Sequence, residues 1–337
     1  MSDNDITFGN LHLSKPIQSS AAPSNAVIAD SESASDAKVL EFLQAARSAN
    51  TRHAYKSDLN HFLAWGGQLP ASDRLIARYL AEHAGLLAIA TLRRRLVAIR
   101  SAHVAHTMQD PTKSELVRLT FRGIRRLHGR PERRVAALVV ADLQAIVSAL
   151  GPSTRDIRDA AILLVGFAGA FRRSELAAID CSDIRIDGAG AVIGIPRSKT
   201  DQEGHGRTVA IPRGNGPLCP VAAVERWLAV SRVTQGPVFR AVTKAGKVAP
   251  TRLSSTAIAN VVKARIRAVG RDPSLYSGHS LRAGFATAAA SAGVPQWRIK
   301  AQTGHLSDAV LGRYIREGEL SAGNGLAVIF EPALETP

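Results

Sequence analysis

Four side chains with complementary chemistry lie within one short stretch of the chain, residues 277–317. They are His279, Arg282, His305 and Tyr314. A tyrosine hydroxyl has a pKa of about 10, so at neutral pH it attacks only where another group accepts its proton and the charge of its target is neutralised. Histidine accepts protons near neutral pH, and arginine binds phosphate oxygens with a fork of donors. The stretch therefore predicts attack by a tyrosine on a phosphodiester.

Such a site needs further residues upstream, because an isolated tyrosine on a helix more often packs against its neighbours than reacts. Arg172 and Glu175 follow the apolar run 160–170, and Lys199 lies in a polar loop between two strand-like segments. A loop lysine by itself is more often a solvated charge than a catalyst. The prediction of a site depends on all these residues acting together.

Together the residues resemble the signature of the tyrosine site-specific recombinases, the phage integrase family. That signature is Arg-x-x-Glu-Leu, a lysine in a hairpin, His-x-x-Arg, a later His or Trp, and a Tyr nine residues after it. This chain matches it in order and spacing at Arg172, Glu175, Lys199, His279, Arg282, His305 and Tyr314. At residue 305 it has the histidine of most members. The resemblance covers about residues 36–330.

The resemblance implies a transesterification that uses neither a metal nor a cofactor. Tyr314 would attack a DNA phosphodiester and form a 3′-phosphotyrosine bond, while Arg172 and Arg282 neutralise the charge of the transition state. Lysine could not replace either guanidinium fork without loss. His279 would accept the proton of the tyrosine, and Lys199 would protonate the leaving 5′ oxygen.

The two remaining residues would support this reaction. His305 would donate to a non-bridging oxygen, and Glu175 would orient the residues that touch the phosphate. The resemblance further implies a homo-tetramer on double-stranded DNA that exchanges strands between two specific sites. Two other functions are weighed: a type IB topoisomerase-like relaxing enzyme, and a DNA-binding protein without catalysis, which would not explain seven matching positions.

The composition favours a polyanionic partner. The 337 residues have a formal net charge of +15 and a pI near 10.6, which makes nucleic acid the first candidate and an acidic membrane its rival. No apolar run approaches the roughly 18–20 residues of a spanning helix, and no signal peptide is visible. Cys181 and Cys219 have no metal-ligand spacing. We expect a cytoplasmic, nucleoid-associated protein that does not bind membranes.

The predicted fold is mainly α (α+β), with two domains that form a C-shaped clamp around DNA. The expected parts are a disordered tail (1–35), a helical core DNA-binding domain (36–129), a linker (130–137), a catalytic domain (138–330) and a C-terminal tail (331–337). In the linker, Pro131 lacks a backbone N–H and disfavours helix at Arg130, which predicts an extended connector.

The first domain shows helical periodicity throughout. Asn50 and Ser72 are the expected N-caps of two helices, Gly85 lies beyond the end of the second, and further helices are expected at about 89–106 and 112–128. Spacings of three, four and seven place most of their arginines on common faces. An arginine-rich face is often only solvated, but here DNA contact is predicted for Arg93, Arg94, Arg95, Arg100, Arg118, Arg122, Arg125 and Arg126.

The second domain is predicted to hold helices at about 138–149, 155–168, 220–232 and 254–269, and a small three-stranded antiparallel sheet. The strands are Ile184–Asp187, Ala191–Pro196 and Arg207–Pro212. Ser280 is expected to cap a helix that reaches Gly293, so His279 and Arg282 would lie at a helix N-terminus, which favours anions. A second helix would run from Pro295 to about Gly304 and a third from Asp308 to about Glu317, capped by Ser307.

An apolar segment, Leu326–Phe330, follows a glycine-containing hinge near the chain end. Exposed apolar side chains are costly, so the segment needs a groove. It could pack onto its own domain. The resemblance favours the alternative, in which each subunit donates the segment to its neighbour in a cyclic assembly.

Overall fold

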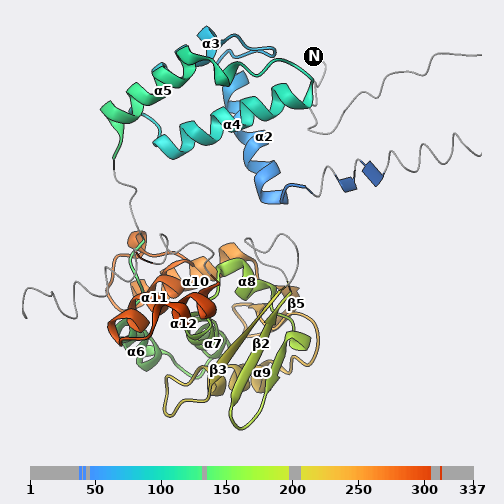
Figure 1. Ribbon diagram of the computed structural model, residues 1–337. Coiled ribbons are helices and arrows are strands. Elements are labelled where there is room, and N and C mark those ends of the chain that lie inside the picture. The colour runs from blue at the N-terminus through green and yellow to red at the C-terminus, as the bar shows by residue number, and fades with distance from the viewer. Residues whose placement is uncertain are drawn as a thin grey trace, which may run out of the picture. The chain divides into compact units, whose positions relative to one another are not determined.

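The computed structural model describes residues 38–39, 41–42, 46–130, 135–196, 206–304 and 312. The chain divides into two compact units, Met1–Glu132 and Arg133–Pro337, which are described separately below (Figure 1). Several predicted features lie outside the described residues. These are the N-terminal tail, residues 131–134 of the linker, Lys199, His305, Tyr314, most of the helix expected from Asp308, the segment Leu326–Phe330 and the C-terminal tail.

The first unit is helical in its described part, as predicted. Apolar side chains from all four long helices, among them Phe62, Tyr79, Leu92 and Ile124, form one core. The helices are α2 (Ala49–Ala64), α3 (Asp73–Glu82), α4 (Ile89–Ala105) and α5 (Glu115–His128), with a short 3-10 turn, η1 (Pro111–Lys113), before α5.

Hydroxyl caps fix where three of these helices begin. Ser72 caps α3 as predicted, because its side chain accepts from the N–H of Leu75. The prediction of Asn50 as the cap of α2 is wrong: Ser48 accepts from the N–H of Thr51, and Asn50 lies inside the first turn. Ser114 caps α5, so that helix begins three residues later than expected.

The second unit is built around one buried helix. Nine residues of α7 (Thr154–Ala168) are buried, and its neighbours contribute to the same core. Those neighbours are α6 (Val140–Ala149), α8 (Arg173–Ala178), α9 (Pro220–Ser231), α10 (Ser255–Ala268) and α11 (Ser280–Ser291), with α12 (Gln296–Thr303) packed on α11 and short 3-10 turns η2 (Cys181–Asp183) and η3 (Pro273–Leu275). None of the described helices is both long and apolar enough to span a bilayer.

The predicted three-stranded sheet is present. Strands β1 (Ile184–Ile186), β2 (Gly190–Ile195) and β3 (Arg207–Pro212) pair antiparallel in that order. The inward positions of β3 alternate with exposed ones, so Arg207, Val209 and Ile211 share one face. A two-stranded sheet, β4 (Arg240–Val242) with β5 (Val248–Arg252), was not predicted.

The N-terminus of α11 is fixed by contacts with the start of the second unit. His279 is the N-cap, and Ser280, expected as the cap, instead accepts from the N–H of Ser277 with its side chain (3.0 Å). Gly284 allows a close approach, because a Cβ there would come within 2.0 Å of the Leu138 carbonyl oxygen. Leu138 in turn donates its N–H to the Ser280 carbonyl (3.0 Å). These contacts hold the helix that presents His279 and Arg282.

Candidate active site

Arg172 and Glu175 form a paired turn at the start of α8. Arg172 is the N-cap; its Nη1 donates to Glu175 Oε1 at 2.6 Å and its backbone N–H donates to Oε2 at 2.9 Å. Glu175 is only 4% exposed. The side chain that is expected to bind phosphate is therefore held by a buried carboxylate.

Glu175 stays ionised in this setting. Burial disfavours the charged form, but the backbone and side-chain hydrogen bonds from Arg172 and the positive charges of Arg207 and Arg172 outweigh it. The pKa of Glu175 consequently lies below its ordinary value. A buried carboxylate held as an anion is an effective orienting group for guanidinium side chains.

Arg207, which the sequence did not single out, shares this carboxylate. Its Nη2 donates to Glu175 Oε2 at 3.0 Å, and its Nη1 donates to the carbonyl of Gln302 on α12 at 2.6 Å. Its guanidinium also lies over the ring of Phe171, 5.8 Å from the centroid. The alternation of inward and outward side chains along β3 could have pointed to Arg207. It places Arg207 on the inward face, where a charged side chain requires a buried partner.

Arg282 is buried, with 1% of its surface exposed. Its Nη1 donates to the carbonyl of Ala170 at 3.0 Å and to the carbonyl of Thr303. Ala170 follows the C-terminus of α7 and has φ 48°, a left-handed conformation that turns the chain toward Arg172. Arg282 thus joins the ends of α7 and α12.

His279 lies close to both arginines. Partial loss of hydration and the positive charges of Arg282 and Arg172 lower the pKa of His279 below 6.5, although the residue keeps contact with solvent. Its backbone N–H donates to Ser277 Oγ at 3.1 Å. A neutral imidazole beside two guanidinium groups can accept a proton while they bind an anion.

The structure thus brings four of the seven predicted residues, Arg172, Glu175, His279 and Arg282, into one cluster, which we call the candidate active site. The other three, Lys199, His305 and Tyr314, lie outside the described residues. Among the described residues, no group of three or more His, Cys, Asp or Glu side chains is arranged to hold a metal ion.

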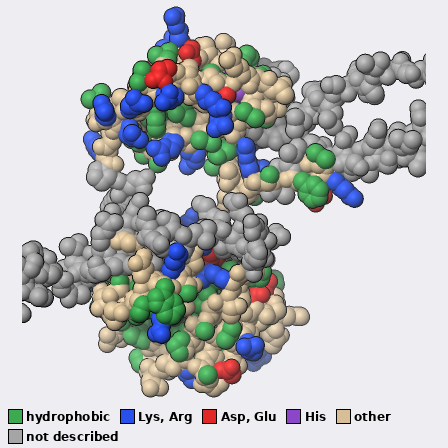
Figure 2. All heavy atoms as spheres, viewed as in Figure 1, with side chains coloured by type: hydrophobic (Ala, Val, Ile, Leu, Met, Phe, Trp, Pro, Cys, Tyr) green, Lys and Arg blue, Asp and Glu red, His purple; other side chains and the backbone are tan. Residues whose placement is uncertain are grey.

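The eight arginines predicted to contact DNA fall into three groups. Arg95 differs from the expectation: it is 8% exposed and its Nη1 donates to Tyr79 Oη at 2.9 Å, so it belongs to the core in this conformation. The other seven are exposed. Figure 2 shows Lys and Arg side chains gathered over α4 and α5 on the visible face of the first unit.

Three of the exposed arginines are paired with carboxylates. Arg94 donates to both oxygens of buried Asp58, at 2.6 and 3.0 Å. Arg100 lies 3.2 Å from Asp110, and Arg118 pairs with Glu115. The side chains of the remaining four form no hydrogen bond or ion pair with another described residue: Arg93, Arg122, Arg125 and Arg126. Their charges are the most available to an external anion.

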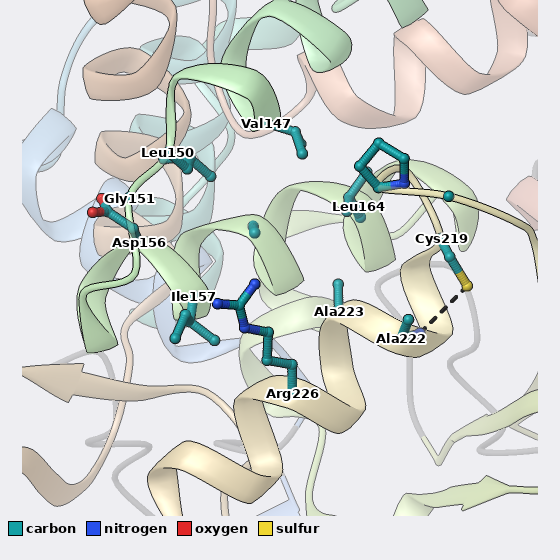
Figure 3. Close-up of a pocket in the computed structure, with 13 residues that line it drawn as sticks. Val147, Leu150, Gly151, Asp156, Ile157, Leu164, Cys219, Ala222, Ala223 and Arg226 are labelled. Carbon is teal, nitrogen blue, oxygen red and sulfur yellow. Dashed lines mark hydrogen bonds between the residues drawn. The ribbon is translucent and has the colours of Figure 1, made fainter.

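An open pocket lies elsewhere in the second unit, between α6, α7 and α9 (Figure 3). Its walls are mostly apolar, and Arg226 points into it from α9 near Ile157 and Ala223. Cys219 accepts the N–H of Ala222 at 3.4 Å there. The pocket shares no lining residue with the candidate active site, so it does not take part in the chemistry proposed for that site.

Comparison with known proteins matches the second unit and most of the chain. The model of the phage integrase family matches residues 137–319. An integrase/recombinase xerD homolog of Selenomonas ruminantium is 34% identical over 294 residues, covering 84% of this chain and 86% of that protein. Recombinase cre of Escherichia phage P1 is 30% identical over 305 residues, covering 82% and 88%.

Solved structures show the same fold. XerH site-specific recombinase bound to palindromic difH substrate, in a post-cleavage complex, has a TM-score of 0.56 and 16% identity, covering 77% of this chain and 72% of that one. A lambda integrase dimer bound to a COC′ core site has a TM-score of 0.57 and 17% identity, covering 80% and 72%. These similarities confirm the mainly helical fold with a small antiparallel sheet.

Proposed function

Because the chain belongs to the phage integrase family, that of the tyrosine recombinases, we propose that it recombines DNA at two specific sites through a 3′-phosphotyrosine intermediate. Membership of this family makes it a site-specific recombination enzyme that cleaves and rejoins DNA strands. The nucleophile, the residue roles and the assembly described below are our proposal.

One observation supports the chemistry most directly. Loss of hydration, together with the positive charges of nearby Arg282 and Arg172, lowers the pKa of His279. A scissile phosphate bound by both guanidinium groups would therefore lie beside a neutral imidazole. Such a site combines charge neutralisation with proton acceptance, the two requirements of a tyrosine nucleophile.

The proposed cleavage step conserves atoms and charge. The Tyr314 oxygen attacks phosphorus, its proton passes to His279, and the bond from phosphorus to the 5′ oxygen breaks. Lys199 gives a proton to that leaving oxygen, while His305 donates to a non-bridging oxygen. The phosphotyrosine retains the energy of the phosphodiester, so a 5′ hydroxyl from another duplex can reverse the step and reseal the strand.

Arg172 and Arg282 begin this step already oriented. Glu175 holds Arg172, and the carbonyls of Ala170 and Thr303 hold Arg282. Groups fixed before the reaction stabilise developing charge without reorganising, which is the larger part of such catalysis. The role of Glu175 is therefore to orient Arg172 rather than to touch the phosphate.

We further propose that double-stranded DNA is bound by the exposed arginines of α4 and α5, and that four subunits assemble on the paired sites. Phosphate contacts by these arginines would position the protein without reading sequence. The apolar segment Leu326–Phe330 would pass to the neighbouring subunit and couple assembly to cleavage. A lambda integrase tetramer bound to a Holliday junction shares the fold, with a TM-score of 0.54.

Trapping the covalent intermediate tests the proposed function. A duplex with a nick near the cleavage point loses its short 5′ hydroxyl fragment after attack, so wild-type protein should accumulate as an adduct. Tyr314→Phe removes one oxygen and little volume; it should bind DNA as well as wild type and form no adduct. Tyr55→Phe, which removes a hydroxyl from α2, is the matched control and should still react. Adducts in Tyr314→Phe would assign the nucleophile elsewhere.

A further inference from the structure

Arg207 connects three segments that are far apart in the sequence. It is the first residue of β3, and it bonds Glu175 at the start of α8 and the Gln302 carbonyl at the end of α12. Its side chain is 17% exposed. A guanidinium is well suited to this position, because its planar fork can serve two acceptors at once.

The contact with Glu175 determines how that carboxylate holds Arg172. Oε1 accepts from the Arg172 side chain, whereas Oε2 accepts from the Arg172 backbone and from Arg207. Without Arg207, Oε2 would lose one of its two donors in a buried setting, and Arg172 alone would hold a carboxylate that could then rotate more readily. Rotation of Glu175 would shift the guanidinium of Arg172.

The contact with Gln302 acts on the other side of the site. Two consecutive carbonyls at the end of α12 accept from arginines: Gln302 from Arg207, and Thr303 from Arg282. The last carbonyls of a helix lack partners within it and carry negative partial charge, so cations there are stabilising. The two arginines together fix the place where the chain leaves α12.

Gly304 shows how closely Arg207 fits this exit. It ends α12 with φ 61°, and a Cβ there would lie 3.2 Å from both Cδ and Nε of Arg207. Any larger residue would be strained by the left-handed backbone and would also press on the arginine. The next residue in the chain is His305, which belongs to the proposed chemistry.

We propose that Arg207 is a positioning residue: through Glu175 and the end of α12, it holds Arg172 and Arg282 in a single geometry around the scissile phosphate. This inference rests on the proposed function. Arg207 does not touch the phosphate itself. The simpler alternative is that Arg207 contributes only to the stability of the folded unit.

Single-turnover cleavage of the nicked substrate separates these two roles. A misplacement of catalytic groups by about 1 Å can cost about a hundredfold in rate, so Arg207→Met should slow adduct formation by roughly ten- to a hundredfold. Half-site affinity should stay within about twofold of wild type, since neither phosphate-binding arginine is removed. Arg207→Lys, which keeps the charge but cannot serve both acceptors as a fork, should fall between wild type and Arg207→Met.

A substrate with a methylphosphonate at the scissile position adds a readout that stability alone would not change. It carries one negative charge less, so it depends less on accurately placed arginines. If Arg207 positions them, the defect of Arg207→Met should shrink several-fold on this substrate. An equal defect on both substrates, matching the folded fraction from thermal melting, would overturn the proposal.

Arg213→Met is the matched control. Arg213 follows the same strand and forms a bidentate pair with Glu225, at 2.9 and 2.6 Å, away from the candidate active site. Its loss should leave the cleavage rate unchanged.

The outcomes separate the two proposals. If wild type forms no adduct, the proposed function fails; if wild type reacts and folded Arg207→Met reacts equally fast, only the role of Arg207 fails. Should Arg207→Met not fold, Arg207→Lys on both substrates decides the same question.

Discussion

The exposed arginines of α5 allow a quantitative test of DNA binding. Arg122, Arg125 and Arg126 lie within one helical face and form no pair with another described residue. Replacing all three by Gln removes three positive charges and keeps a good helix former at each position. The helix and its buried residues Val117 and Ile124 should remain intact.

The size of the effect follows from counterion release. Each phosphate neutralised on duplex DNA contributes about 0.9 to the slope of log K against log salt, so three contacts contribute about 2.7. Between 50 and 200 mM salt, a fourfold change, this corresponds to a factor of about 40 in affinity. Between these two salt concentrations, the factor by which affinity falls should therefore be about 40 times smaller for the triple variant than for wild type. The variant should also bind more weakly than wild type at every salt concentration.

Fluorescence anisotropy with a labelled half-site duplex at four salt concentrations measures these slopes. Arg78→Gln is the control for a surface arginine outside the proposed interface: Arg78 lies on α3, is 70% exposed and is 3.7 Å from Glu82. Its slope should equal that of wild type. An unchanged slope in the triple variant would refute the reasoning, because it would mean that α5 does not contact phosphates.

Three further predictions concern residues of the proposed chemistry and assembly. Lys199→Ala should cleave normal DNA poorly but recover on a 5′-bridging phosphorothiolate, whose sulfur leaves without a proton; equal defects on both would remove Lys199 as the acid. The His279 ring should titrate below pH 6.5 in DNA-free protein, as NMR can measure, because lost hydration and the charges of Arg282 and Arg172 lower its pKa. The unfolded chain then binds the proton more readily than the folded chain, so the free energy of unfolding should fall as pH drops from about 6.5 toward the folded-state pKa. A midpoint of the His279 titration at or above pH 6.5 would contradict this. Truncation after Gly325 should preserve half-site binding and weaken cooperative binding to full sites in gel-shift titrations, whereas unchanged cooperativity would mean that Leu326–Phe330 packs in cis.

Signals that depend on nearby residues predicted the fold well. Ser72, Gly85 and Gly304 mark helix ends through hydroxyl caps or positive φ, and short strand-like runs, the first two separated by turn residues, located all three strands of the first sheet. The prediction failed where two nearby residues could both serve as the N-cap of a helix. Ser48 and Asn50 can both cap a helix, and which one does so depends on packing that periodicity does not reveal.

The candidate active site was predictable where a family signature exists and unpredictable where a contact joins distant segments. Arg172, Glu175, His279 and Arg282 follow the signature, and the structure brings them together. Arg207 reaches Glu175 across 32 residues and Gln302 across 95. No local pattern specifies such pairs, because they follow from how β3, α8 and α12 pack.

Arginine has at least two separable roles in this chain. Which role a given arginine has depends on whether its guanidinium reaches a buried hydrogen-bond acceptor. Arg95 and Arg207 find buried acceptors and become part of the folded framework, whereas the side chain of Arg122 finds none among the described residues and leaves its charge to an external anion. DNA affinity and active-site geometry should therefore depend on different arginines. Arg207→Met should slow cleavage without changing the salt slope, and the α5 triple variant should change the salt slope without slowing cleavage of fully bound substrate. Measuring both variants in both assays tests this division, since one variant that altered both quantities would show that the two roles are coupled.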